Sequence, residues 1–448
     1  MASPATGSRV IWGLGLELEP GIPGGTALEF FNPVLPLEAN LVSEEAPSKA
    51  VNRSGFLEPG TPGDKTGKIS FADRFTVTRI LPFLWGLFGI VTKTNPVAGV
   101  YRYVFEPGLD GPGLAASFWS YGALPPQERG YGSFIRFDEL KLDLKSGGEL
   151  VAALKGYRGH GSRSGLAVAD AGNTGTYSLG PWLRGPVAST AGSIAVQVTQ
   201  VVGGLQFKTF QGAGAPAFTG AAHDVYLDPV SGRGAWQILV DEAGLDVGLV
   251  GENYDPCQIV WPGAPADHAD LDVGDVFTFE PEQASDPATT VLAGRRFTTA
   301  HLQAFQRAIG APDWVPLQGL EGELMIQNKI EAVSTFGTRY YGRLDRNGLF
   351  EAGVKVKRRY TDRTFVDTAD RHERLQLRLL FEGQQLTAAY REGLDFVFGS
   401  AMVGSPKRDP KDQKLVDEEI ELTAETDGAG SHPLTATVTT ARDWTPPA

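Results

Sequence analysis

Residues 68–91 read KISFADRFTVTRILPFLWGLFGIV and carry the strongest structural signal in the chain. In the first part, apolar residues such as Phe71 and Val77 are interspersed with polar and β-branched ones, which predicts a strand. The second part has apolar residues at spacings of three and four and predicts a short helix. Pro82 suits the first turn of that helix, because its missing N–H needs no partner there, and Gly89 suits the end.

This predicted helix is apolar nearly all round, so it must be covered on several sides. One interpretation is a core helix packed under a sheet. The other is that one side packs on the sheet while a second subunit covers the opposite side. Under the second interpretation, the inter-subunit contacts come from Leu81, Phe83, Leu84, Trp85, Leu87 and Phe88.

Composition indicates a folded protein of more than one domain. A chain of 448 residues is too long for one ordinary core, so we expect two or three domains. The apolar fraction of 42% and the aromatic fraction of 10% argue against a disordered chain. The single cysteine, Cys257, excludes an internal disulfide framework and a cysteine-based zinc site.

Charge divides the chain into three parts. Residues 166–295 hold 15 acids and 4 bases, whereas residues 1–165 hold 16 of each and residues 296–448 hold 22 acids and 20 bases. The acidic middle therefore has a different surface from its flanks, which indicates a separate module. The whole chain has a net charge of −13 and no basic cluster, so we do not expect it to grip nucleic acid.

No segment predicts a membrane anchor or a cleaved signal. The N-terminal residues lack an apolar core of signal-peptide length. The longest apolar run, residues 80–91, is interrupted by Pro82 and is too short to cross a bilayer. We therefore expect a soluble protein with no membrane partner and no secretion by a cleaved signal.

Most periodic segments alternate between apolar and polar residues, so the predicted fold class is all-β with small flanking helices. Leu140 and Leu142, for example, alternate with Lys141 and Asp143. Gly- and Pro-rich stretches and the charge boundaries divide the chain. The predicted units are an N-terminal extended arm (1–67), a first β domain (68–165), an inserted acidic β-sandwich (166–295) and a second β domain (296–448).

A second helix is predicted at residues 296–310, RFTTAHLQAFQRAIG, from the spacing of Leu302, Phe305 and Ile309. Its opening Arg-Phe-Thr and closing glycine match RFTVTRILPFLWGLFG at residues 74–89. This match suggests an internal duplication, in which the first and second β domains are two copies of one fold.

No residue pattern predicts catalysis. The HExxH, GxSxG and P-loop patterns are absent, and the six histidines are scattered. The best metal-like cluster runs from Asp267 to Asp275; its acids could ligate calcium, but it lacks the twelve-residue loop with a closing glutamate. Solvated acidic loops are the more common case, so we expect no metal, no cofactor and no enzyme activity.

The layout and several local sequences resemble the major tail tube proteins of long-tailed, siphovirus-like bacteriophages. The resemblance covers residues 45–165 and 296–448. In the first range and just before it, it rests on IWGLGLELEPGIPG, GKISFADRF, LPFLWGLFG and YGSFIRFDELKLDLKSGGELVAALKGYRG. In the second range it rests on STFGTRYYGRLDRNGLFEAGVKVKRRYTDRTF, LRLLFEG and AETDGAGSHPLTATVTTAR.

The resemblance implies a tail-tube β-sandwich, as two tandem tube-like halves with the acidic β-sandwich inserted between them and facing outward. It implies a structural virion protein that self-assembles into stacked rings, the conduit for DNA ejection. The rings are trimeric and pseudo-hexameric if each chain supplies two tube domains, or hexameric if it supplies one. Implied partners are other copies of the chain and the tape measure, tail tip and terminator proteins, while double-stranded DNA passes through without specific binding. The implied location is the virion tail, after synthesis in the bacterial host cytoplasm.

Two sets of site residues follow from the resemblance. The inter-ring loop candidates are Gly108, Leu109, Asp110, Gly111, Pro112 and Gly113. The lumen candidates are Glu419 and Glu421, on the polar face of an alternating strand. Lys141 and Lys145 also lie on such a face, which leaves the lumen assignment open.

The alternative function is a β-rich glycan-binding or glycan-cleaving protein. Its candidate sugar platforms are Trp119, Trp182, Trp236 and Trp261, although we expect most of these side chains in the core or in an interface. A capsid or surface-array subunit is a third possibility. The assembly state separates the three, because a tube protein forms rods, a glycan enzyme stays a monomer or dimer, and an array protein forms sheets or shells.

Overall fold

The structure, a computed structural model, describes residues 11–19, 22–23, 28–31, 33–46, 61–74, 76–108, 112–115, 117–124, 128–145, 150–160, 168–176, 181–184, 193–212, 215–227, 234–240, 255–261, 270–279, 289–290, 297–319, 321–334, 341–409, 416–426 and 432–445. Strands make up most of these ranges, and the helices in them are short. The fold is therefore all-β with small helices, as predicted.

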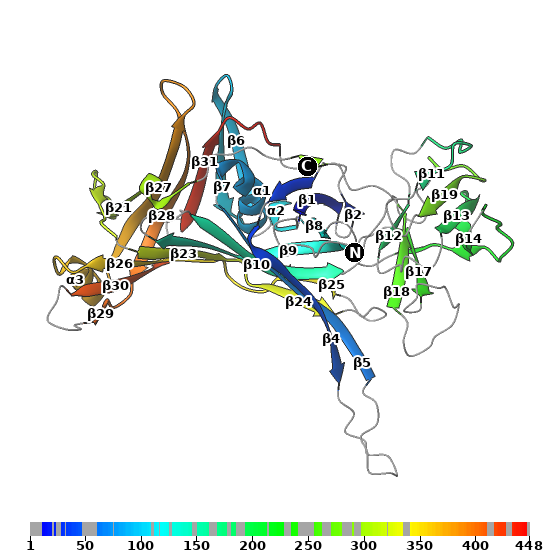
Figure 1. The fold of residues 1–448 in the computed structure, drawn as a ribbon, viewed down its shortest axis with the longest axis horizontal. Helices are drawn as coiled ribbons and strands as arrows, with labels where there is room; N and C mark the ends of the chain where they lie inside the picture. Colours follow the sequence, from blue (N-terminus) through cyan, green and yellow to red (C-terminus); the bar gives the residue numbers. More distant parts are fainter. Residues whose placement is uncertain are drawn as a thin grey trace, which may run out of the picture.

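The first of two large antiparallel sheets stands upright in Figure 1. Its strands, in order across the sheet, are β6 (Gly89–Val97), β7 (Val100–Pro107), β31 (Leu434–Thr440), β28 (Arg391–Val403), β27 (Arg374–Gln385), β21 (Leu302–Ala308) and β22 (Val315–Pro316). Alternate residues such as Leu377, Leu379 and Phe381 are buried, so one face of this sheet lies on the core.

The second sheet crosses the body below the first. Its strands, in order, are β4 (Pro33–Ala46), β5 (Thr61–Arg74), β10 (Val151–His160), β9 (Glu128–Lys145), β23 (Glu321–Gln327), β26 (Glu351–Arg359), β30 (Asp417–Ala424) and β29 (Lys407–Asp409). The two sheets meet at β28, because residues 393–398 of that strand pair with β31 and residues 401–403 pair with β30.

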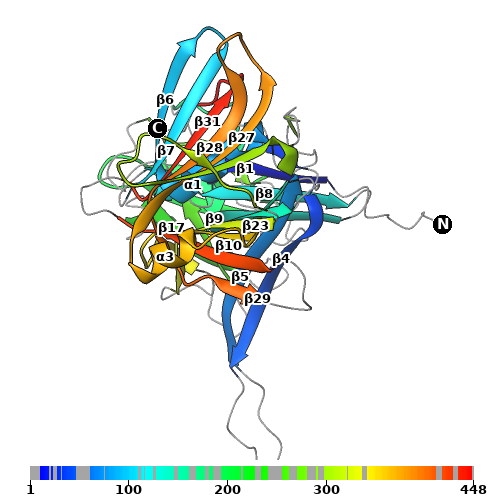
Figure 2. The same ribbon diagram turned by 90° about the vertical axis from the view of Figure 1, so that its left-hand side faces the viewer.

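Smaller elements cover the ends of this body. The first half of β9 pairs with β8 (Phe118–Leu124), which pairs with β1 (Ile11–Glu19), and β1 pairs with β3 (Leu28–Phe31). Two short strands lie at the margin: β2 (Ile22–Pro23) pairs with β1, and β20 (Thr289–Thr290) pairs with β3. A hairpin of β24 (Ile330–Ser334) and β25 (Tyr341–Arg346) contacts β10 and β5. Residues 1–67 are therefore not simply an extended arm, because their described parts pair into sheets. One hairpin, β4–β5, does project away from the body in both views (Figures 1 and 2).

The apolar helix of the sequence is α1 (Val77–Phe88), and it lies in the angle between the two sheets. It begins earlier than expected, so Pro82 lies inside it and cannot donate a backbone hydrogen bond to the carbonyl of Thr78. The guanidinium of Arg442 donates to that carbonyl instead. The helix ends as predicted at Gly89, whose φ of 90° favours glycine.

Elements from both ends of the chain cover α1. It contacts β6, β7, β9, β28 and β31, as well as the short helix α2 (Pro112–Ala115). The side chains proposed as inter-subunit contacts are each 4% exposed or less within the single chain: Leu81, Phe83, Leu84, Trp85, Leu87 and Phe88. These six residues leave no surface for a second subunit. That assignment is corrected in favour of the core-helix interpretation.

The two tandem halves expected from the sequence form one sandwich. β9 of the first half pairs with β23 of the second, and β7 pairs with β31. One continuous core accordingly runs from Leu14 to Trp444. The division into separate first and second tube-like domains is therefore wrong for the described strands.

The helix expected at residues 296–310 is also wrong. The chain makes a short 3-10 turn at Thr299–His301 and then continues as β21. Seven consecutive residues of β21 pair with β27, and this tertiary pairing overrides the helical spacing of the apolar residues. Ile309, expected on the buried stripe, is exposed beyond the strand end. The duplication inferred from the Arg-Phe-Thr match loses its basis.

Two small sheets within the acidic middle enclose a core of their own, which includes Val196, Phe207, Trp261 and Phe277. One sheet contains β11 (Val168–Ala169), β19 (Val276–Phe279), β13 (Ser193–Gln200), β14 (Gln206–Gly212) and β15 (His223–Asp224). The other contains β12 (Trp182–Arg184), β18 (Asp255–Val260), β17 (Gly234–Val240) and β16 (Tyr226–Leu227). This small sandwich lies beside the main body in Figure 1.

The burial of α1 predicts a large effect of truncating one of its side chains. Leu84 is 0% exposed, so Leu84→Ala should lower the free energy of unfolding of the unassembled chain by about 2–5 kcal/mol. Urea unfolding at low protein concentration measures this loss. Leu349 is 78% exposed, and Leu349→Ala is the control, with a change within about 0.5 kcal/mol. A Leu84→Ala chain that keeps its stability but no longer self-associates would contradict the core role of α1.

Candidate functional site

The outward face of the second sheet gathers most of the charged side chains of its strands. We call it the polar sheet face. Among side chains that the structure describes, it carries bases and acids in similar numbers. The bases include Lys68, Arg136, Lys141, Lys155, Lys355, Lys357, Arg359 and Lys407, and the acids include Glu139, Asp143, Glu321, Glu323, Glu351, Asp417, Glu419 and Glu421.

One cross-strand row on this face alternates strictly in charge. The row runs through Glu321, Lys357, Glu419 and Lys407, on β23, β26, β30 and β29 in that order. Each step places an acid directly opposite a base, and such pairs contribute about 0.2–1 kcal/mol each. The row contributes to the register of these strands, together with their buried apolar face.

A second row runs through Asp143, Glu323, Lys355 and Glu421. Lys141, one row away, donates to Glu323 at 2.7 Å and lies 3.5 Å from Asp143. The hydrogen bond to Glu323 raises the pKa of Lys141, and the nearby charge of Asp143 adds to the effect.

Further ion pairs on the face also join neighbouring strands. Lys355 is 3.7 Å from Glu421, Lys357 is 3.9 Å from Asp417, and Lys155 is 2.7 Å from Glu139. Most of the lysines on the face therefore have a carboxylate within 4 Å. A polyanion that approaches the face meets cations that already have partners.

The lumen candidates Glu419 and Glu421 are exposed on the polar sheet face. Lys141 shares this face, because β9, β23, β26 and β30 are consecutive strands of one sheet. Lys141 is paired to Glu323 there, while the side chain of Lys145 lies outside the described residues, and the lumen assignment stays a prediction.

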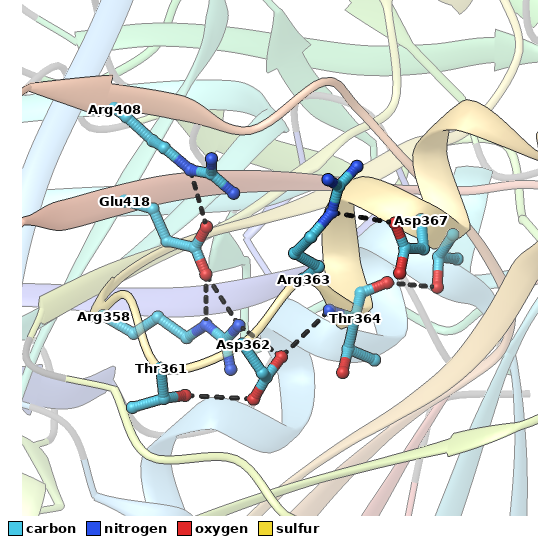
Figure 3. Close-up of polar contacts among 9 residues, drawn as sticks. Arg358, Thr361, Asp362, Arg363, Thr364, Asp367, Arg408 and Glu418 are labelled. Carbon is cyan, nitrogen blue, oxygen red and sulfur yellow. Dashed lines mark hydrogen bonds and ion pairs between the residues drawn. The ribbon is translucent and has the colours of Figure 1, made fainter.

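A buried ion pair lies on the inner side of the same two strands, β26 and β30 (Figure 3). Arg358 is 6% exposed and Glu418 is 1% exposed. Nε and Nη2 of Arg358 donate to one oxygen of Glu418, at 2.7 and 2.6 Å. The Arg408 guanidinium lies 3.6 Å from the other oxygen. Removing one partner of such a pair leaves an uncompensated buried charge. The pair therefore holds the end of β26 against β30.

Asp362 extends this network toward the surface. Its carboxylate lies 3.3 Å from Nη2 of Arg358 and accepts hydrogen bonds from the backbone N–H of Thr364 and the hydroxyl of Thr361, both at 3.0 Å (Figure 3). The hydrogen bonds from Thr364 lower the pKa of Asp362 to about 2. They also fix the loop that leads into helix α3 (Thr364–Asp370), whose Phe365 ring lies 4.5 Å from the Arg358 guanidinium.

Sequence reasoning did not find this network, although a signal was present. In β26 the outward positions are Lys355 and Lys357, so Arg358 falls on the apolar side of the alternation. Glu418 breaks the alternation of β30 in the same way. Two opposite charges on buried positions of strands indicate an internal ion pair once the strands are known to be neighbours.

The inter-ring loop prediction is corrected for the residues that can be placed. Gly108 and Gly113 are buried against α1: the N–H of Gly108 donates to the carbonyl of Phe88 at 2.9 Å. A Cβ on Gly113 would lie 2.2 Å from the carbonyl oxygen of Trp85, so glycine is required by close packing. Pro112 begins α2, which contacts α1. Leu109, Asp110 and Gly111 lie outside the described residues.

The acidic cluster gives no binding site in the described ranges, and of the four candidate tryptophans only Trp261 has a described side chain, since those of Trp119, Trp182 and Trp236 lie outside the described part. Both carboxylate oxygens of Asp275 accept backbone N–H groups, from Thr174 and Asp272 at 2.9 Å each. Asp267 lies outside the described part of the chain, and the part that can be placed holds no group of three potential metal ligands. Trp261 is a core residue of the small sandwich, so it is not a sugar platform.

Comparison with known proteins adds no identification. No protein-family model matches the sequence, and no curated protein matches it significantly. In the residue ranges that can be placed, no helix has the length and apolar character needed to cross a membrane.

The lowered pKa of Asp362 predicts a defined pH dependence. A carboxyl whose pKa is lower in the folded state stabilises the fold above its unfolded pKa and loses this effect as the pH falls through the folded value. Asp362→Asn should therefore destabilise the protein near neutral pH, and its difference from the unmodified chain should shrink from about pH 4 to about pH 2. Thermal unfolding over this pH series measures the difference. Asp370→Asn, at an exposed position on α3, is the matched control; a constant difference for Asp362→Asn would refute the assignment.

Proposed function

We propose that this chain is a structural subunit of a tube, of the kind formed by the major tail tube proteins of long-tailed bacteriophages. In this proposal, copies of the chain join into rings, the rings stack, and the channel conducts double-stranded DNA. The observation that carries the proposal is the second sheet, which combines a polar face rich in paired charges with a long strand edge that has no partner among the described residues.

The free edge is that of β4. In the part of the chain that can be placed, this 14-residue strand pairs only with β5. Residues 61–66 of β5 pair only with β4, so the outer part of the hairpin is a two-stranded ribbon. Such ribbons are marginally stable alone, and long free edges are normally covered or paired. A neighbouring copy of the chain supplies that cover in a ring.

The ring order follows from the single sandwich. Because both halves of the chain merge into one body, each chain supplies one tube-like unit. This favours six chains in each ring over the trimer of double units that the sequence duplication suggested. The acidic small sandwich then decorates the tube, and its negative charge keeps neighbouring tubes apart.

The polar sheet face supports the conduit role as the channel wall. A channel that conducts DNA must avoid capturing phosphates, because each phosphate held by Lys or Arg adds affinity. On this face most of the lysines have carboxylate partners within 4 Å. Tape measure, tail tip and terminator proteins are the other partners of this proposal, and the virion tail is the location.

Negative-stain microscopy of the purified chain tests the assembly proposal. We expect rods at high protein concentration, and averaged end views with six chains per ring. Three full-length chains per ring would contradict the single-unit argument. A stable monomer or dimer that never assembles would sink the tube proposal and favour the glycan-binding alternative, while sheets or shells would favour an array subunit.

Charge reversal on the polar sheet face tests the conduit proposal. The variant Glu419→Lys/Glu421→Lys should assemble but retain short double-stranded DNA when tubes form in its presence, and the retention should fall steeply with salt. Tubes of the unmodified chain should retain none. Asp370→Lys adds a cation on α3, away from this face, and is the control. Equal DNA retention by both variants would show that Glu419 and Glu421 do not face the channel.

A further inference from the structure

The loop between β25 and β26 carries the only Asn-Gly step in the sequence, Asn347–Gly348. Both residues are exposed, and the following Leu349 is 78% exposed. Residues 347–350 belong to no helix, strand or hydrogen-bonded turn. Glycine has no Cβ to shield its backbone nitrogen, so in an open loop that nitrogen can reach the side chain of the preceding asparagine.

The backbone nitrogen of Gly348 is free to react. Arg346 donates to the carbonyl oxygen of Gly348 at 3.1 Å, whereas no group among the described residues accepts the Gly348 N–H. Asn347 differs, because its own N–H donates to the carbonyl of Lys329 at 2.9 Å. Packing requires glycine at position 348, since an added Cβ would lie 2.6 Å from Cβ of Lys329. The fold itself therefore keeps the Asn-Gly step in place.

The side-chain amide of Asn347 holds the two strands of the β24–β25 hairpin together at this end. Its Nδ2 donates a hydrogen bond to the carboxylate of Glu331 on β24. Glu331 lies directly opposite Asp345 on β25, so two acids face each other across the hairpin. Like charges at opposite positions of a strand pair are destabilising. Asn347 thus supplies a neutral donor at a point where the hairpin places two acids side by side.

We propose that Asn347 is a site of spontaneous deamidation, which replaces this donor with a carboxylate and loosens the β24–β25 hairpin. The backbone nitrogen of Gly348 attacks Cγ of Asn347, and the new C–N bond closes a succinimide ring. The Cγ–Nδ2 bond breaks, and Nδ2 leaves as ammonia with the proton of the Gly348 N–H. Water then opens the ring. Cleavage of the new bond gives aspartate, and cleavage of the original peptide bond gives isoaspartate, whose main chain is longer by one methylene.

The product differs from asparagine in the one property that the hairpin uses. An ionised carboxylate only accepts hydrogen bonds, so aspartate at position 347 cannot donate to Glu331 and repels it instead. Isoaspartate also lengthens the backbone of the loop. The reaction consumes only water, and every group involved lies within one chain, so the proposal does not depend on the tube function.

Peptide mapping by mass spectrometry, after incubation of the folded full chain at mildly alkaline pH, tests the chemistry. We expect the mass gain of deamidation at Asn347, together with isoaspartate there. Asn173 is the internal control, because the N–H of the following Thr174 donates to Asp275 at 2.9 Å and Oδ1 of Asn173 accepts from Val276. Asn347→Gln keeps the amide but needs a larger ring, so it should show no gain over the same period. Deamidation at Asn347 no faster than at Asn173 would overturn the proposal.

Asn347→Asp installs the product directly and tests its effect on the hairpin. Hydrogen exchange in β24 and β25 should become about fivefold faster in this variant, as expected for the loss of one hydrogen bond. Glu331→Gln in the same chain removes the repulsion and restores a donor, so the double variant should exchange like the unmodified chain. Exchange that Asn347→Asp leaves unchanged, or that Glu331→Gln does not restore, would contradict the loosening of the hairpin.

Discussion

The fold depends on the need to cover α1 on every side. Nine of its residues are buried, and burying a large apolar side chain contributes about 1.5–3 kcal/mol. No single sheet face can cover a helix that is apolar all round. The covering strands come from opposite ends of the chain, with β7 and β9 from the first half and β28 and β31 from the second. The helix therefore joins two sequence halves into one sandwich.

Local sequence patterns predicted single strands and helices better than they predicted which strands pair with each other. The alternation around Leu140 and Leu142 predicted a half-buried strand, and Gly89 marked the end of the helix; both agree with the structure. The strand β21 was predicted as a helix because its apolar spacing fits a helix, and only its pairing with β27 decides otherwise. Pairing across hundreds of residues, as between β7 and β31, leaves no local trace in the sequence.

For the candidate sites too, local sequence patterns were informative, whereas contacts made by the tertiary fold could not be predicted. Glu419 and Glu421 were predicted as exposed because strand alternation is local. Gly113 was assigned to an inter-ring loop from the family resemblance, whereas the structure shows that glycine is needed there because the Trp85 backbone approaches closely. The buried ion pair of Arg358 and Glu418 was missed because 60 positions separate the two residues, and β26 and β30 are brought together only by the tertiary fold.

The closing residues of the chain have a consequence for its synthesis. The hydroxyl of Tyr103 donates to the carbonyl of Trp444, and 341 positions separate the two residues. Ribosomes add about 5–20 residues per second, so roughly 20–70 s pass between the appearance of one residue and of the other. During that time α1 emerges without β31 or Trp444 to cover it, while the small acidic sandwich already has all its strands. The nascent chain thus carries an incompletely covered apolar helix until translation is nearly complete, although α2, β6, β7 and β9 are made soon after it.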